Sequence, residues 1–282
     1  MSKRVVFIND FRVYNKRYRN LTMKHFREIG YEVMNLGLFD TPFRTILSAL
    51  FERHIVSSNM KSNLFLLLFF WRKNVLIING LGKFKYKKIF RLILIVLFFL
   101  NWRTKILFQN YLDYRYFKIY AKNKKYELIY GSGASKRIIS SCDNTFVVCR
   151  PGKFNYVKED IYNASRSLNR RFNLVGMELS NEYVNGVGYV PQSKIFAFGS
   201  VLFVPSGYGE GIPHVLVDAI FSDCKVLITK QQILSYGLSN MYNIIKIYSN
   251  KYLLCKFKDS AKSLVSVTQV NKKILNSLLD SE

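Results

Sequence analysis

The chain has 282 residues, of which 49% are hydrophobic, 16% aromatic and 22% charged, and this apolar content excludes an intrinsically disordered or low-complexity protein. The 43 Lys and Arg residues exceed the 18 Asp and Glu residues, which gives a formal net charge of +25. Residues 1–140 hold 27 of the basic and 7 of the acidic side chains, so the positive charge belongs mostly to the N-terminal half.

The cysteines do not form a metal-binding or disulfide pattern. The four cysteines include no Cys-x-x-Cys pair, and the chain has only three histidines. A chain of this length with so few cysteines is not a disulfide scaffold, so we expect reduced thiols and no zinc site. The first residues, Met1–Arg4, precede a short strand-like run and do not resemble a secretory signal peptide.

In the first half of the chain, strand-like apolar runs alternate with helical segments. Strands are predicted over residues 5–9, 31–36, 74–79, 104–109 and 127–130, and helices over 20–29 and 87–100. The two longest apolar runs, Leu64–Trp71 and Leu92–Leu100, are shorter than the roughly 20 residues of a membrane-spanning helix. We therefore expect them to be buried elements or an interfacial surface.

The same alternation restarts near residue 139. Strands are predicted over residues 144–149, 172–176, 187–190, 201–204 and 225–229, and helices over 158–168, 213–222 and 261–280. This order predicts an α/β protein with two Rossmann-like domains, residues 1–138 and 139–282.

The segment from Val201 to Thr229 carries the clearest chemical pattern. A buried strand leads into Pro205-Ser206, then into a turn with Gly207, Gly209 and Gly211, and then into a helix opened by Pro213. Proline fits the start of a helix, and glycines let a ligand approach the backbone closely. The free N–H groups at a helix start suit a phosphate or a sugar hydroxyl.

This segment resembles the sugar-nucleotide motif of glycosyltransferase family 4, the retaining enzymes of GT-B fold. The resemblance implies that the two domains face a central cleft. The family pattern is Pro-Ser, then Glu-Gly-x-Pro, then a second acid eight residues after the first. Glu210 and Asp218 occupy the two acid positions here, with Asp218 in place of the usual Glu. The resemblance implies that Glu210 lies by the donor sugar and that Asp218 binds the ribose hydroxyls.

Weaker matches extend the resemblance over residues ~75–230. The stretch 146–153 resembles the family element that places two cations on the donor diphosphate, which implies roles for Arg150 and Lys153, with Lys158 as the alternative for the second cation. The resemblance implies catalytic roles for Arg150, Lys153 and Glu210. It implies donor binding by Ser206, Gly209, Gly211, Ile212, Pro213, Asp218 and Gly133.

The sequence departs from the family in its first domain. Asn9-Asp10-Phe11-Arg12 stands where a Gly-rich loop is usual, and neither His25 nor His54 lies in a motif typical of the family's catalytic histidine. The chain is also short for the family, which leaves open a reduced or inactive homologue. No Asp-x-Asp sequence occurs, so we expect no metal or other cofactor, and stabilisation of the leaving phosphate by cations and a helix start.

The positive charge favours a membrane over nucleic acid as a partner. The 12 basic residues from Arg44 to Lys105, against the single acid Glu52, are interspersed with both long apolar runs. Apolar residues beside Lys and Arg suit an anionic lipid surface, whereas nucleic-acid grooves present aromatics on polar surfaces. A basic solubilising surface and a nucleic-acid-binding protein remain the alternatives.

Taken with the resemblance, these features predict a peripheral glycosyltransferase on the inner face of the cytoplasmic membrane. It would move a sugar, with retention, from a nucleotide sugar such as a UDP-sugar to a lipid-linked oligosaccharide in O-antigen or capsule synthesis. The alternative from another class is a non-catalytic partner protein that keeps the fold.

Overall fold

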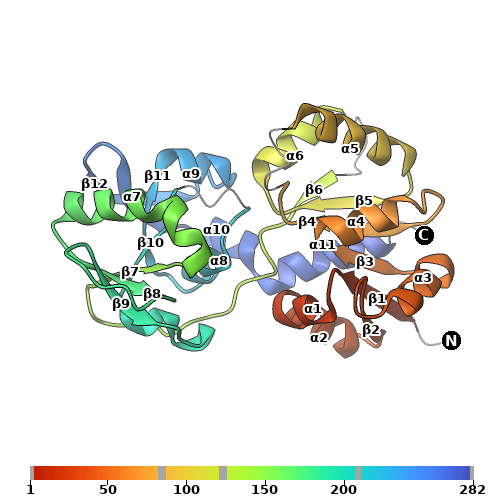
Figure 1. Cartoon of the computed structure of the whole chain (residues 1–282), viewed down its shortest axis with the longest axis horizontal. Coiled ribbons are helices and arrows are strands. Elements are labelled where there is room, and N and C mark those ends of the chain that lie inside the picture. The colour runs from red at the N-terminus through yellow and green to blue at the C-terminus, as the bar shows by residue number, and fades with distance from the viewer. Residues whose placement is uncertain (1–2, 82–86, 121–125, 207–210, 280–282) are drawn as a thin grey trace. The chain divides into compact units, whose positions relative to one another are not determined.

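The computed structural model describes residues 3–81, 87–120, 126–206 and 211–279. The chain divides into two compact units (Figure 1). Unit 1 comprises residues 1–133, 210–212 and 267–282, and unit 2 comprises residues 134–209 and 213–266.

Unit 1 is built on a parallel sheet with the strand order β2-β1-β3-β4-β5-β6. Its strands are β1 (Arg4–Asn9), β2 (Glu32–Gly37), β3 (Ile55–Ser58), β4 (Asn74–Ile78), β5 (Lys105–Phe108) and β6 (Tyr126–Leu128). Its helices are α1 (Arg12–Tyr18), α2 (Asn20–Glu28), α3 (Pro42–Phe51), α4 (Met60–Leu67), α5 (Lys88–Leu100), α6 (Tyr111–Lys118) and α11 (Val267–Leu279). Sequential strands on both sides of β1 make this a doubly wound, Rossmann-like sheet.

Helices cover both faces of this sheet (Figure 1). Successive side chains of β1 point to opposite faces, so Val6 and Ile8 enter one apolar core and Val5 and Phe7 enter the other. The first core is closed by α3, α4, α5 and α6, and the second by α2 and α11. The inner strands β1, β3, β4 and β5 are therefore buried on both faces, which explains their mostly apolar sequences, whereas β2 and β6 are partly exposed.

Unit 2 contains a seven-stranded sheet with the order β12-β13-β11-β10-β7-β8-β9. Strands β7 to β11 are parallel, and the hairpin β12–β13 adds two antiparallel strands beside β11. The strands are β7 (Thr145–Val148), β8 (Phe172–Val175), β9 (Val184–Gly188), β10 (Val201–Phe203), β11 (Lys225–Thr229), β12 (Tyr242–Tyr248) and β13 (Tyr252–Phe257). The helices are α7 (Pro151–Leu168), the 3₁₀ helix η2 (Gln192–Phe198), α8 (His214–Phe221), α9 (Lys230–Ser235) and α10 (Asp259–Val265).

The two sheets confirm the prediction of an α/β protein with two Rossmann-like units. The end of the chain differs from the predicted single helix over 261–280, because α10 ends at Val265 and the next residue, Ser266, has an extended backbone (φ −60°, ψ 145°). The first helix of this pair belongs to unit 2 and the second to unit 1.

The assignment of α11 to unit 1 follows from its apolar stripe. Val270, Ile274 and Leu278 are at most 2% exposed and pack in the core that contains Phe7 and Leu107. The structural units thus differ from a division into residues 1–138 and 139–282, since the chain returns to unit 1 after residue 266. Helical spacing of apolar residues predicts a buried face but does not say which sheet it covers.

Candidate functional site

The carboxyl ends of two neighbouring strands bring predicted donor-site residues to one edge of unit 2. Strands β7 and β10 pair in parallel, with Val147 opposite Phe203. Arg150 follows β7 and Ser206 follows β10, so both leave the sheet at the same edge. Doubly wound sheets bind their ligands in crevices outside this edge.

Helix α7 begins at this edge with two cations. Arg150 is its N-cap residue in extended conformation (φ −84°, ψ 146°), and Pro151 occupies its first turn. Arg150 is exposed and Lys153 is half-buried, whereas Lys158 lies more than a turn farther along the helix. The N–H groups and the partial positive charge at the start of this 18-residue helix add to the charge of Arg150 and Lys153. The arrangement suits a diphosphate.

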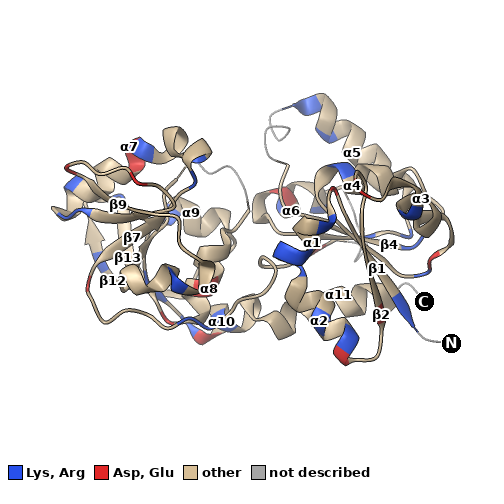
Figure 2. Ribbon diagram, turned by 60° about the horizontal axis from the view of Figure 1, so that its bottom comes forward, with Lys and Arg blue, Asp and Glu red and all other residues tan. Residues whose placement is uncertain are grey.

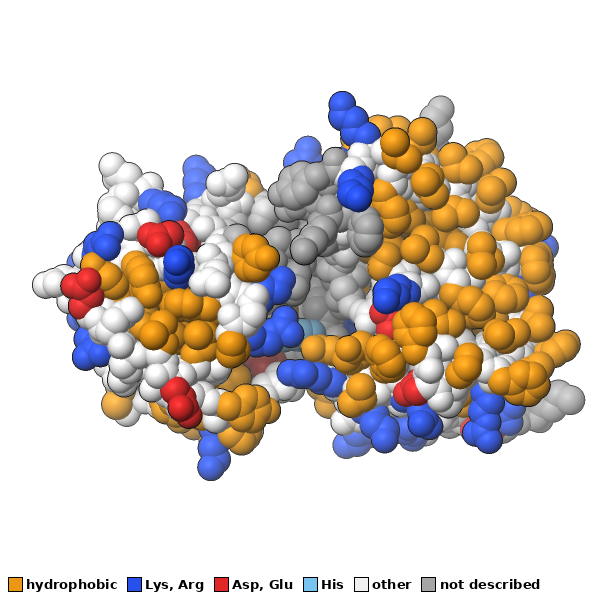
Figure 3. Space-filling view, in the orientation of Figure 1, with side chains coloured by type: hydrophobic (Ala, Val, Ile, Leu, Met, Phe, Trp, Pro, Cys, Tyr) orange, Lys and Arg blue, Asp and Glu red, His pale blue; other side chains and the backbone are white. Residues whose placement is uncertain are grey.

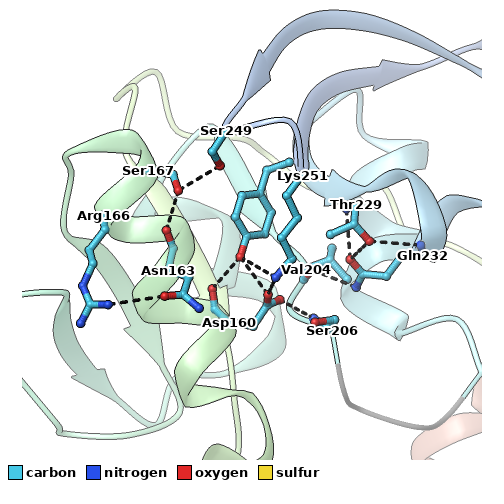
Figure 4. Close-up of polar contacts among 11 residues, drawn as sticks. Asp160, Asn163, Arg166, Ser167, Val204, Ser206, Thr229, Gln232, Ser249 and Lys251 are labelled. Atoms are coloured by element: carbon cyan, nitrogen blue, oxygen red, sulfur yellow. Dashed lines mark hydrogen bonds and ion pairs between the residues drawn. The ribbon is translucent and has the colours of Figure 1, made fainter.

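The carboxylate of Asp160 on α7 fixes the start of the Gly-rich turn (Figure 4). It accepts a hydrogen bond from the backbone N–H of Ser206 at 2.7 Å, from the Lys251 Nζ at 2.5 Å and from the Tyr252 hydroxyl at 2.8 Å. Burial raises the pKa of Tyr252 to about 12, so the phenol stays a donor at neutral pH. Ser206 is thereby tied to the helix that carries Arg150 and Lys153.

This network predicts a specific acid sensitivity. Burial alone would raise the pKa of Asp160, but hydrogen bonds from Lys251, from Ser206 and from Tyr252 outweigh it and lower that pKa below its ordinary value. A carboxyl group with a lowered folded-state pKa stabilises the fold above its unfolded pKa, and this stabilisation is lost as the pH falls through the folded pKa. We expect the free energy of unfolding to fall more steeply below about pH 4 in the wild type than in Asp160→Asn. Urea titrations at several pH values measure this, and parallel pH profiles would contradict it.

The helix after the Gly-rich turn begins one residue later than predicted. Pro213 is the N-cap residue in extended conformation (φ −64°, ψ 139°), and His214 is the first helical residue of α8. Because α8 connects the parallel neighbours β10 and β11, its start lies at the same edge of the sheet as the start of α7. No sequence motif marks His214, yet its place at a helix start on this edge makes it an additional candidate for contact with an anion.

The structure describes only part of the Gly-rich turn. Gly209 and Glu210 lie outside the described residues. Gly211 and the buried Ile212 group with unit 1. A Cβ on Gly211 would lie 2.8 Å from the carbonyl oxygens of Asn79 and Gln109, so this close approach requires glycine.

Asp218 is buried and already hydrogen-bonded. Its Oδ2 accepts from the Arg137 Nε at 2.9 Å and Nη2 at 2.7 Å, and its Oδ1 accepts from the backbone N–H of Ser135 at 2.8 Å. Gln192 donates to Oδ2 over a longer distance, 3.4 Å. The Asp218 side chain is 6% exposed and that of Arg137 16%. This carboxylate therefore holds the first segment of unit 2 against α8, a role that the sequence did not indicate.

Gly133 has a packing role in unit 1. Its φ of +90° favours glycine, and an added Cβ would lie 2.6 Å from the Cα of Val267 at the start of α11. The backbone conformation and the contact with α11 both require glycine at this position, and its predicted role in donor binding stays a prediction.

Unit 1 carries a polar cluster at the carboxyl ends of its own strands. Asn59 donates to Asn9, and Asn79 donates to Asn59 at 2.8 Å, so one chain of amides crosses the ends of β1, β3 and β4. The guanidinium of Arg19, which is 1% exposed, donates to Ser58 at 3.1 Å, to Ser132 at 3.1 Å and to Asn79 at 3.2 Å. In the sequence, the signal for this cluster is a polar residue at the end of each of these buried strands or directly after it.

Burial lowers the pKa of Arg19 to about 10, so the guanidinium stays cationic at neutral pH. Within the described part of the chain its hydrogen-bond partners are neutral oxygens. A buried cation and several amides at the ligand-binding edge of a sheet suit a polar or anionic ligand.

The two first-domain histidines lie away from this edge. His54 is 7% exposed and directly precedes β3, with its ring 6.3 Å from that of Tyr31. His25 lies in the second half of α2, which leads back to the start of β2, and its ring is 6.2 Å from that of Phe26. Their surroundings indicate packing roles.

The described residues lack two kinds of feature. In this part of the chain, no three His, Cys, Asp or Glu side chains gather in a way that could hold a metal ion. Over the same residues, no helix combines the length and the apolar character needed to cross a membrane.

Comparisons with known proteins identify the fold. No family model matches the sequence, and no curated protein matches it. A proposed UDP-N-acetylglucosamine 2-epimerase from Listeria monocytogenes has 10% identity and a TM-score of 0.52, over 99% of this chain and 88% of that chain. A spinosyn forosaminyltransferase has 9% identity and a TM-score of 0.49, over 100% and 96% of the two chains. The S. aureus MnaA–UDP structure has 9% identity and a TM-score of 0.47, over 80% and 79%.

At such low identity the likeness establishes a shared fold, two Rossmann-like units of GT-B type. Because no family model matches, membership of glycosyltransferase family 4 stays a prediction from the motif.

Proposed function

We propose that the chain is a glycosyltransferase that moves a sugar, with retention, from a UDP-sugar to a lipid-linked oligosaccharide. The observation that carries this proposal is the edge of unit 2 where Arg150, Lys153 and Ser206 meet the start of α7. UDP is proposed as the nucleotide because the sequence motif resembles enzymes that use nucleotide sugars, and the Listeria structure of similar fold is named for a UDP-sugar.

In this proposal the edge binds the donor diphosphate. When the bond between the anomeric carbon and the phosphate oxygen breaks, negative charge grows on the diphosphate, and Arg150, Lys153 and the α7 start stabilise it. No metal ion is required, because these groups supply the positive charge. Activity that is lost on chelation and restored only by Mn²⁺ would contradict this.

The sugar and ribose contacts are assigned by the motif. Glu210, Gly209 and Gly211–Pro213 would hold the donor sugar and phosphate, and Asp218 the ribose. A ribose hydroxyl would take the place of Gln192, which is the most distant of the donors to Asp218. The acceptor would approach unit 1, whose basic surface suits the inner face of the cytoplasmic membrane, as expected for O-antigen or capsule synthesis.

A screen of nucleotide sugars for thermal stabilisation tests the proposal. A ligand that binds only the folded state stabilises it by about 2.7 kcal/mol at 100 times its Kd, and this raises the melting temperature. We expect UDP-sugars to raise the melting temperature of the wild type, and to raise that of Arg150→Met by less at the same concentration. If no nucleotide sugar shifts the melting temperature, the proposal is wrong.

A non-catalytic partner protein of the same fold is the second candidate. Glu210→Gln separates the two, since an enzyme loses turnover while its melting temperature stays unchanged. A partner protein keeps its cellular function with this substitution. If the chain is a nucleic-acid-binding protein, it should shift a duplex or a single strand in a gel and should not bind to anionic vesicles.

A further inference from the structure

Large apolar side chains are exposed on the side of unit 1 that α3, α4 and α5 cover (Figure 3). They come from α3, from the residues that follow α4, and from α5 and the turn after it. We call this set the apolar face, and its members are Phe43, Ile46, Leu47, Leu50, Phe51, Leu68, Phe70, Trp71, Ile89, Leu92, Ile93, Val96, Phe99, Leu100 and Trp102.

Helix α3 presents its apolar stripe outward. Its buried residues are the small Thr45, Ser48 and Ala49, whereas Phe43 is 72% exposed and Phe51 is 76% exposed. The helices of globular proteins bury the apolar stripe and expose the polar one. The reversed orientation of α3 indicates a partner that is itself apolar.

The apolar face is larger than ordinary surface patches. Phe43, Phe51, Phe99 and Trp102 are 70–80% exposed. At 150–250 Å² for each aromatic side chain, these four alone expose roughly 450–750 Å². The largest patch on a typical monomer covers about 300–600 Å², and larger ones mark interaction sites.

Cations surround the apolar face. Exposed basic side chains lie within α3 and α5 or next to their ends, and they are Arg44, Arg53, Lys87, Lys88 and Arg103. The guanidinium of Arg103 lies 4.8 Å from the ring centroid of Trp102. The neighbouring acid, Glu52, is paired with Arg4 at 3.0 Å. In Figure 2 the ribbon of these helices has several blue Lys and Arg positions and few red Asp and Glu positions.

We infer that the apolar face docks unit 1 onto an anionic lipid bilayer. Apolar side chains would enter the boundary between headgroups and acyl chains, while the surrounding cations bind acidic headgroups. A second copy of the chain fits less well, because a two-fold interface would bring Arg44 and Arg103 against like charges. Helix α5 has 13 residues, about 20 Å, so it lies along the membrane surface and does not cross the ~30 Å core.

This inference rests on the proposed function in one respect only, which is the lipid-linked acceptor. If the acceptor is lipid-linked, docking through α3 and α5 holds the enzyme at the surface where the acceptor is concentrated. The docking itself requires no sugar transfer, and it can be measured without a nucleotide sugar.

The chain contains two tryptophans, Trp71 and Trp102, and both belong to the apolar face. Their fluorescence therefore reports on this surface without a label. We expect vesicles of phosphatidylglycerol and phosphatidylcholine to shift the emission to shorter wavelength and brominated lipids to quench it. Pure phosphatidylcholine vesicles should bind more weakly, because they offer no net negative charge.

Paired substitutions identify the surface. The double variant Phe51→Ser/Phe99→Ser keeps both tryptophans and should bind the anionic vesicles at least about tenfold more weakly, because two large exposed apolar side chains are lost. The matched control is Ile138→Ser/Tyr189→Ser, which removes two side chains of unit 2 that are 94% and 86% exposed. It should bind as the wild type does.

Three outcomes would overturn the inference. The first is a wild-type chain that does not respond to anionic vesicles, and the second is a double variant that responds as strongly as the wild type. The third is a dimer in solution that the double variant abolishes, which would make a second copy the occupant. Stabilisation by a UDP-sugar without vesicle binding would leave the donor site intact and reject only the membrane surface.

Discussion

Arg150→Met should lower the rate of sugar transfer by about 100-fold or more, the loss typical when a group that stabilises developing negative charge is removed. Arg150 precedes the first turn of α7 and is exposed at the edge where β7 and β10 end. The substitution removes a cation but no buried contact, so the free energy of unfolding should stay unchanged. Steady-state kinetics with saturating donor measures the change in kcat.

Arg170→Met is the matched control for this substitution. Arg170 is an exposed arginine of the same unit that pairs with Asp143 at 3.3 Å, next to the start of β8 and so at the opposite edge of the sheet. Its loss should leave kcat unchanged. Equal effects of the two substitutions would show that net charge matters and not the position of Arg150.

Asp218→Ala should lower the free energy of unfolding by about 3–5 kcal/mol, because it leaves the guanidinium of Arg137 buried without its charged partner. Two guanidinium nitrogens of Arg137 donate to the same oxygen, Oδ2 of Asp218, at 2.9 and 2.7 Å, and the side chains of Asp218 and Arg137 are 6% and 16% exposed. The backbone N–H of Ser135 also loses its acceptor. Denaturant unfolding without ligand measures the loss.

Two variants make the Asp218 prediction specific. Asp143→Ala breaks exposed ion pairs with Arg170 and Lys225 and should cost less than about 1 kcal/mol. The double variant Asp218→Ala/Arg137→Met should recover part of the loss, since it removes the unpaired charge. If Asp218→Ala costs no more than Asp143→Ala, the pair does not hold this part of unit 2 together.

The sequence predicted the sheets because their strands are apolar on both faces. The runs 74–79, 201–204 and 225–229 were read as strands, and they correspond to β4, β10 and β11. The hairpin β12–β13 was missed, because five consecutive residues of β12 are exposed and its sequence lacks a buried-strand pattern. Helix α7 was predicted from residue 158, although Pro151 marks its true first turn.

The candidate site was only partly predictable. Arg150, Lys153 and Ser206 were predicted from the resemblance to the family motif. Each follows a strand within a few residues, so chain order places them at one edge of the sheet. The partners that fix them come from far along the chain, since Asp160 and Lys251 are 91 residues apart and Arg137 and Asp218 are 81 apart. Such pairings depend on the order of the strands and on where each loop leaves the sheet, and no local sequence pattern encodes them.

The orientation of α3 shows a different limit. This helix was not among the predicted elements, and apolar residues at helical spacing do not say whether a stripe faces the core or an external partner. The packing of the small side chains Thr45, Ser48 and Ala49 toward the sheet decides it. Only the structure shows that Phe43 and Phe51 are left outside.

Transfer of a radiolabelled sugar from a UDP-sugar into a membrane lipid extract tests the central claim most directly. The account predicts that label enters the lipid fraction with the wild type, that UDP is released in equal amount, and that Arg150→Met supports neither. Conversion of the UDP-sugar to another UDP-sugar, with no label in any acceptor, would contradict it and would show that this fold serves a different reaction here.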